Sequence, residues 1–218
     1  MASVIVFGAT GLVGEAVLSE LSVANEVTSI ISYGRRQPLH QCLKMRNIRG
    51  EYQDLRADLS DVSAEHCFIA LGTTIRKAGS QAAFRDVDYR MVLDAARWAS
   101  QAGVKSVAVV SSVGADPNAF AFYPRVKGEV EEELKGLNIP RLLIFRPGLL
   151  LGDRREFRFG ETLATPLMKV VNFALVGRGA RYRAISAQDV AKAMVKQSLG
   201  LVSGAQTSTV IEGLDFYR

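Results

Sequence analysis

Val4-Ile5-Val6-Phe7-Gly8-Ala9-Thr10-Gly11-Leu12-Val13-Gly14 is the stretch that decides the fold. Its four apolar residues predict a buried strand, and its three glycines have the spacing GxxGxxG. Val13, Val17 and Leu21 then recur at helical spacing, so a helix is expected over residues 12–21.

A glycine turn between a strand and a helix is the setting of a dinucleotide-binding loop. Glycine lets the backbone turn tightly and come close to a pyrophosphate, and the N-terminus of the helix offers free N–H groups to its charge. The alternative is a glycine-rich turn that binds no ligand. The candidate cofactor-binding residues of this loop are Gly8, Thr10, Gly11, Leu12, Val13 and Gly14.

Strand-like and helix-like segments alternate along the rest of the chain. Further strands are expected over 27–33, near 50–53, and over 67–71, 106–110 and 142–145; helices are expected over 81–102, 124–134, 161–175 and 187–199. Continuous apolar strands are typical of a parallel sheet covered on both faces. We therefore predict an α/β fold, a Rossmann-type doubly wound parallel sheet with helices on both faces. Residues 1–218 are expected to form a single NAD(P)-binding domain with a small substrate-side portion near the C-terminus.

The composition is that of an ordinary globular protein, with 48% hydrophobic and 22% charged residues among 218. The net charge of +5 comes from scattered Lys and Arg, so neither a nucleic-acid arm nor a membrane partner is predicted. Cys42 and Cys67 have no metal-ligand spacing and are interpreted as reduced thiols. Because no secretory signal precedes them, a cytoplasmic location is expected. No metal is predicted, and His40 and His66 are interpreted as structural or surface residues.

The residues after the second expected strand bear on the choice of cofactor. An acid is expected there, roughly 20 residues after the glycine loop, when NAD is bound, because it holds the ribose hydroxyls. This chain instead has Ser32-Tyr33-Gly34-Arg35-Arg36. Two guanidinium groups suit the 2′-phosphate of NADPH, and the alternative is a solvated basic turn.

Tyr123 and Lys127 are spaced i, i+4 and are predicted to share one face of a helix. They follow a strand that ends in Ser111-Ser112. The ammonium would make the phenol easier to deprotonate, the phenol would exchange a proton with a carbonyl or alcohol oxygen, and a serine would hold that oxygen. The alternative is an interfacial tyrosine beside a solvated lysine.

Taken together, these residues resemble the atypical short-chain dehydrogenases/reductases, and within them the branch of the HIV Tat-interacting protein and its bacterial homologues. The resemblance covers nearly the whole chain. It is most specific in residues 71–79, 87–88, 123–131 and 145–148, and in Asp153-Arg154 and Gly160-Glu161, which follow the last of these stretches. Its members that modify sugars have longer C-terminal ends, so bulky nucleotide-sugar substrates are not expected.

The resemblance implies a role for each matching residue. Thr10 to Val13 would line the phosphates, Arg35 and Arg36 the 2′-phosphate, and Tyr123 and Lys127 the nicotinamide ribose. The other implied cofactor contacts are Asp54 near the adenine, Leu71, Gly72 and Thr73 beneath the ribose, and Pro147, Leu150 and Arg158 after the strand expected over 142–145. The catalytic serine is Ser111 or Ser112, and the place of Ser112 nearer the strand end favours it.

Two functions fit these features. The first is an NADPH-dependent oxidoreductase that reduces a small carbonyl substrate with Tyr123 as proton donor. The second is a non-catalytic NADPH-sensing protein that regulates a protein partner. The Ser–Tyr–Lys set favours the enzyme, since a sensor needs no acid. The sequence predicts neither the substrate nor the oligomeric state.

Overall fold

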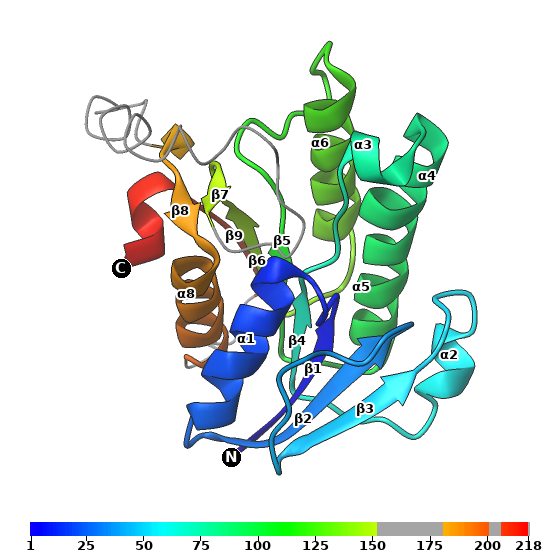
Figure 1. The fold of residues 1–218 in the computed structure, drawn as a ribbon, viewed down its shortest axis with the longest axis vertical. Helices are drawn as coiled ribbons and strands as arrows, with labels where there is room; N and C mark the ends of the chain where they lie inside the picture. Colours follow the sequence, from blue (N-terminus) through cyan, green and yellow to red (C-terminus); the bar gives the residue numbers. More distant parts are fainter. Residues whose placement is uncertain (152–180, 201–205, 218) are drawn as a thin grey trace.

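The computed structural model describes residues 1–151, 181–200 and 206–217. Seven parallel strands form one sheet in the order β3-β2-β1-β4-β5-β6-β9 (Figure 1). They are β1 (Ala2–Phe7), β2 (Val27–Gly34), β3 (Met45–Arg49), β4 (His66–Ile69), β5 (Ser106–Val110), β6 (Arg141–Arg146) and β9 (Thr207–Glu212). The chain builds outward from β1 to β3 and then returns to β4, so the topological switch point lies between β1 and β4. This is the predicted Rossmann-type fold, and the prediction is confirmed.

Helices cover both faces of the sheet because successive strand residues point to opposite sides. Val4 and Val6 of β1 face α1 (Leu12–Val23) and α8 (Ala187–Leu199), while Ile5 and Phe7 face α5 (Val92–Gln101). Figure 1 shows α1 beside α8, and α5 beside α6 (Phe122–Lys135) on the other face. Trp98 of α5 is buried and its ring packs edge-on against Phe7, which is the packing role expected of it.

The helix expected over 81–102 is present, but it contains a change of pitch. It consists of α4 (Gln81–Arg85), the π-helical turn η1 (Asp86–Met91) and α5. The Ser80 hydroxyl begins it by accepting a hydrogen bond of 3.1 Å from the backbone N–H of Ala83. Single π-helical turns are often found at functional sites. This one contains Asp88, which is almost completely buried.

The prediction of a strand near residues 50–53 is wrong. The strand is β3, Met45–Arg49, and the chain turns after it into the short helix α2 (Leu55–Asp58). A Cβ on Gly50 would lie under 3.0 Å from the Asp58 carboxylate and the Tyr33 hydroxyl. This glycine therefore allows the turn to pass close to the end of β2, which the apolar pattern did not indicate.

Several further elements were not predicted from the sequence pattern. They are α3 (Ile75–Ala78), the paired strands β7 (Leu150–Leu151) and β8 (Ile185–Ser186), the edge strand β9 and the 3-10 helix η3 (Gly213–Tyr217). The helix expected over 187–199 is confirmed as α8, and the one expected over 161–175 lies outside the described residues.

Candidate functional site

The glycine loop lies across the switch point at the carboxyl edge of the sheet. Gly8 has φ of 77°, a left-handed conformation that favours glycine, and its carbonyl accepts a hydrogen bond of 3.0 Å from the N–H of Gly11. A Cβ on Gly8 would lie under 3.0 Å from Ala70 and Leu71, and one on Gly14 would lie under 3.0 Å from Gly8. The loop is therefore packed tightly between β4 and α1, and the first turn of α1 opens toward the edge where open α/β sheets bind ligands.

Arg35 and Arg36 follow β2 directly and are exposed. Within the described ranges, neither guanidinium has an ion-pair or hydrogen-bond partner. A hydrogen bond from Arg90 holds the pKa of Asp86 below its usual range, and the charge of Arg35 adds to this effect. Arg35 is therefore exposed at the carboxyl end of β2, with its charge available for an anion.

Tyr33 and Asp58 join β2 to the turn and short helix that follow β3. The Tyr33 hydroxyl lies 2.7 Å from Asp58 Oδ2 and 2.8 Å from the carbonyl oxygen of Glu51. Burial raises the pKa of Tyr33, and the neighbouring Asp58 raises it further. Asp54, the residue expected near the adenine, is exposed and stands at the N-terminus of α2. Its carboxylate makes no capping bond to that helix, so it is free to meet a ligand.

Tyr123 and Lys127 occupy successive turns of α6, as the spacing predicts. Tyr123 is 36% exposed, and its ring lies against Phe84 with 5.6 Å between centroids. Lys127 is buried, and its Nζ lies 2.7 Å from Asp88 Oδ1. Burial alone would lower the pKa of Lys127, but Asp88, with Tyr123 and Glu131, raises it overall. Lys127 is therefore an ammonium ion that Asp88 fixes one helical turn from Tyr123.

Asp88 is the site residue to which the sequence assigned no role. Its side chain is 1% exposed; Oδ1 accepts from Lys127, and Oδ2 accepts a hydrogen bond of 2.7 Å from the backbone N–H of Thr73. One carboxylate thus joins the helix that carries Tyr123 to the loop after β4. The signal was present, because Asp88 interrupts an apolar helix face that includes Phe84 and Met91.

The two candidate serines differ in what their hydroxyls bind. The Ser111 hydroxyl donates to the buried carboxylate of Glu131, which also accepts a hydrogen bond of 2.9 Å from Arg146 Nε. The Ser112 hydroxyl has only a long contact of 3.4 Å with the carbonyl oxygen of Val113. Ser111 is therefore committed to a structural network, and Ser112 is the more available donor.

The remaining predicted cofactor contacts surround the same edge. Leu71, Gly72 and Thr73 follow β4, and Thr73 is held by Asp88. Pro147 follows β6, and its carbonyl oxygen accepts a hydrogen bond of 3.0 Å from Val113 N–H. Leu150 begins β7, whereas Arg158 lies outside the described residues. The described site thus brings together the glycine loop, the arginine pair and the Tyr–Lys helix at one edge of the sheet.

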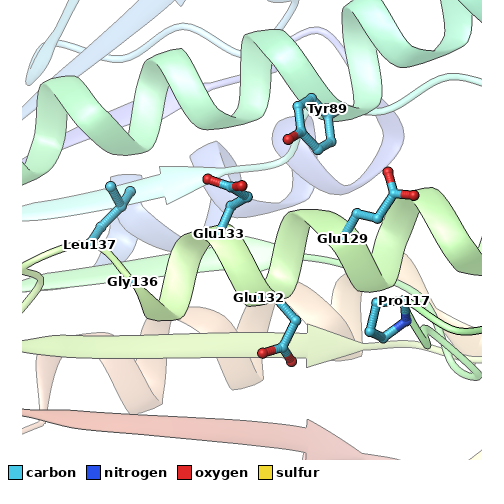
Figure 2. A pocket seen from close by; sticks show the side chains of 7 residues that line it. All are labelled: Tyr89, Pro117, Glu129, Glu132, Glu133, Gly136 and Leu137. Carbon is cyan, nitrogen blue, oxygen red and sulfur yellow. The ribbon is translucent and has the colours of Figure 1, made fainter.

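A groove of about 530 Å³ lies elsewhere, between α6 and the helix over residues 81–101 (Figure 2). Glu129, Glu132 and Glu133 line it together with Tyr89, Pro117, Gly136 and Leu137. Glu129 is paired with Arg85 and Glu132 with Lys135, and the residues that line the groove include no Lys or Arg that would bind a phosphate. The groove is therefore not a candidate for the cofactor.

Three other features of the described residues bear on function. No group of three or more His, Cys, Asp or Glu side chains is arranged there to hold a metal ion. None of the helices in the same ranges has both the length and the apolar character needed to span a membrane. His66 is buried with its Nδ1 2.8 Å from the Ser106 hydroxyl, and burial lowers its pKa. It is a structural residue, as expected.

The sequence of the chain is similar to those of several named proteins. The chain is 38% identical over 166 residues to the protein HTATIP2 of Rattus norvegicus. The aligned region covers 74% of this chain and 68% of the rat protein. It is 36% identical over 157 residues to the protein FMP52-1 of Scheffersomyces stipitis, covering 70% and 69%. No protein-family model matches the chain.

Two solved structures with the same fold are distant from this chain in sequence. A short-chain dehydrogenase family protein from Francisella tularensis has a TM-score of 0.66 at 17% identity, with each chain fully covered. MoeE5, solved with UDP-glucose and NAD, has a TM-score of 0.70 at 16% identity, with 96% of this chain and 76% of that chain covered.

The cytoplasmic location expected from the sequence is wrong on this comparison, because the FMP52 relatives are named as mitochondrial proteins. That expectation rested on unpaired cysteines and on the lack of a secretory signal. Neither feature distinguishes one reducing compartment from another.

Proposed function

Because the chain belongs to the HTATIP2 and FMP52 family of atypical short-chain dehydrogenases/reductases, we propose that it is an NADPH-dependent oxidoreductase that reduces a small carbonyl compound. The observation that carries the proposal is the position of Tyr123 one helical turn from the buried ammonium of Lys127, at the sheet edge that also holds the glycine loop.

The described residues fit NADPH. The turn at Gly8 packs against Ala70 and Leu71, and Gly14 packs against Gly8, so the helix starts close to the end of β1, as the glycines of a pyrophosphate-binding loop require. The helix that follows offers N–H groups to the phosphates. Arg35 and Arg36 present two unpaired guanidinium groups within the described ranges, and these would bind the 2′-phosphate. The net charge of +5 then serves an anionic cofactor, without a nucleic-acid or membrane partner.

In the proposed reaction, bound NADPH supplies the hydride. Tyr123 donates the proton to the substrate oxygen from its O–H, and Ser112 holds the same oxygen by a hydrogen bond. The Lys127 ammonium stabilises the phenolate left on Tyr123 after the proton has moved. Asp88 keeps that ammonium in place, because its carboxylate is fixed at the other end by Thr73.

A second function is favoured by one specific observation. The charge of Lys127 is largely balanced by Asp88 at 2.7 Å, so its effect on Tyr123 is weaker than that of an unpaired ammonium. This suits a protein that binds NADPH without turnover and regulates a protein partner. The two functions differ in whether Tyr123 has any chemical work to do.

The test replaces Tyr123 with phenylalanine and measures NADPH oxidation with a panel of small aldehydes, ketones and quinones. Tyr123→Phe should lower turnover by about 10²–10⁴-fold, the usual value of a positioned acid, while NADPH affinity and melting temperature stay close to wild type. Tyr89→Phe, in the acidic groove, is the matched control and should keep its activity. A Tyr123→Phe protein with full activity would overturn the catalytic assignment. NADPH binding without turnover of any substrate by the wild type would favour the regulatory function.

A further inference from the structure

Glu15 connects the phosphate-loop helix to the segment that carries the arginine pair. Glu15 lies in the first turn of α1. Its Oε1 accepts a hydrogen bond of 2.7 Å from the backbone N–H of Leu39, and its Oε2 accepts one of 3.0 Å from that of His40. Both N–H groups belong to the connection between β2 and β3, which runs back along the sheet after Arg35 and Arg36 (Figure 1).

Other side chains fix this connection on its opposite side, toward β3. Gln37 Oε1 accepts a hydrogen bond of 3.1 Å from Arg49, and Gln41 Oε1 accepts one of 2.7 Å from Asn47. The side-chain amide of Gln41 also donates to the carbonyl oxygen of Pro38 at 2.8 Å. In the described ranges, Glu15 bonds the middle of this segment to the first turn of α1, and Lys44 Nζ bonds its end to the carbonyl oxygen of Ala24 at the C-terminus of the same helix. Glu15 therefore ties the segment that follows the arginine pair to the helix that begins at the phosphate loop.

We propose that Glu15 is a positioning residue for cofactor selectivity, which holds Arg35 and Arg36 where they meet the 2′-phosphate. The inference rests on the proposed use of NADPH. Glu15 touches neither the cofactor nor the reacting atoms in this proposal; it acts through the backbone of Leu39 and His40.

The sign of the effect separates positioning from simple electrostatics. A carboxylate near the phosphates of a dinucleotide repels them, so neutralising Glu15 should tighten binding if charge alone matters. If Glu15 positions the arginine pair, its loss should weaken binding of the 2′-phosphate despite the removed repulsion. The binding of NAD⁺, which has no 2′-phosphate, should change little.

The experiment is calorimetric titration of Glu15→Ala and Glu15→Gln with NADP⁺ and with NAD⁺. We expect Glu15→Ala to weaken NADP⁺ binding about tenfold, the equivalent of one charged hydrogen bond, and to leave NAD⁺ within about twofold. Glu15→Gln keeps one acceptor oxygen and should lie between Ala and wild type. The control is Glu26→Gln, which removes an exposed carboxylate beyond the end of α1 and should change neither affinity.

A second background makes the test specific. In Arg35→Ala/Arg36→Ala protein, adding Glu15→Ala should weaken NADP⁺ no further, because there are no guanidinium groups left to position. Tighter NADP⁺ binding by Glu15→Gln would overturn the inference in favour of charge alone. Equal weakening of both cofactors would overturn it in favour of a damaged phosphate loop. A wild type without preference for NADP⁺ would refute the proposed cofactor itself, whereas a wild-type preference unchanged in Glu15→Ala would refute only the role of Glu15.

Discussion

The buried pair of Asp88 and Lys127 gives a prediction whose size follows from the structure. Their charged atoms lie 2.7 Å apart, with side chains that are 1% and 6% exposed. At an effective dielectric constant of about 20, the attraction is about 6 kcal/mol. Removing the two groups from water costs several kcal/mol for each ion, so the intact pair contributes little net stability. Removal of one partner, however, leaves the other charge buried and unpaired.

We therefore expect Asp88→Asn and Lys127→Met each to lower the free energy of unfolding by about 3 kcal/mol or more. The double variant should lose clearly less free energy of unfolding than the sum of the two single variants, because neither charge is then left buried without its partner. The coupling free energy should be at least about 2 kcal/mol. Urea unfolding of the four proteins, followed by circular dichroism, measures each value. Additive losses would refute the claim that the two charges depend on each other.

The same pair predicts a change in how stability depends on pH. In the wild type the pKa of Lys127 is raised overall. Its contribution to the free energy of unfolding is therefore fully present below the pKa of an unfolded lysine, and it is lost only at strongly alkaline pH, as the pH rises through the pKa of Lys127 in the folded protein. In Asp88→Asn, burial is no longer balanced and lowers the pKa of Lys127. The unfolded state then binds more protons, so the stability of Asp88→Asn should rise between about pH 8 and 10. A flat profile in both proteins would contradict this reasoning.

Three further predictions concern single positions. Gly14→Ala places a Cβ under 3.0 Å from Gly8 and should abolish measurable dinucleotide binding in titrations, while circular dichroism still shows the folded protein. Gly128→Ala places a Cβ under 3.0 Å from the backbone of Asp116 and Pro117, so it should lower the free energy of unfolding by about 1–3 kcal/mol, measured in urea, although alanine is the better helix former. A variant that is more stable than wild type would refute this packing. The pKa of His66 is lowered by burial, so the unfolded state binds its proton first and stability should fall as pH drops below about 6.5. That part of the profile should vanish in His66→Gln, and an unchanged slope would contradict the role of burial.

Local patterns predicted the elements whose residues determine their own structure. The run of residues 4–14 contains the strand, the turn and the helix start together, and α8 was predicted to the residue because its apolar spacing is regular. The edge strand β9 was missed because its first residues, from Thr207, are polar and exposed, so no apolar run marks it. The π-helical turn η1, which packs against α6, was missed because no residue pattern in the sequence distinguishes a π-helical turn from the α-helix on either side of it.

The candidate site was predicted as far as its motifs extend. Tyr123 and Lys127 were found from their spacing, but their partner Asp88 lies on another helix and meets Lys127 only in the folded chain. Glu131 is a similar case. It lies among Glu129, Glu132 and Glu133, a cluster of acids typical of a solvated helix face, yet it is buried against Ser111 and Arg146. Contacts between residues far apart in the sequence become visible only in the folded structure, because helical periodicity predicts which residues are buried but not which residues they contact.

The most direct test of the central claim is calorimetric titration of the wild-type protein with NADPH and with NADH under the same salt conditions. Arg35 and Arg36 stand where an acid would hold the ribose of NAD, and a charged hydrogen bond contributes about 1.5–3 kcal/mol. The account predicts that NADPH binds at least about tenfold more tightly than NADH. Equal affinities, or a preference for NADH, would contradict it.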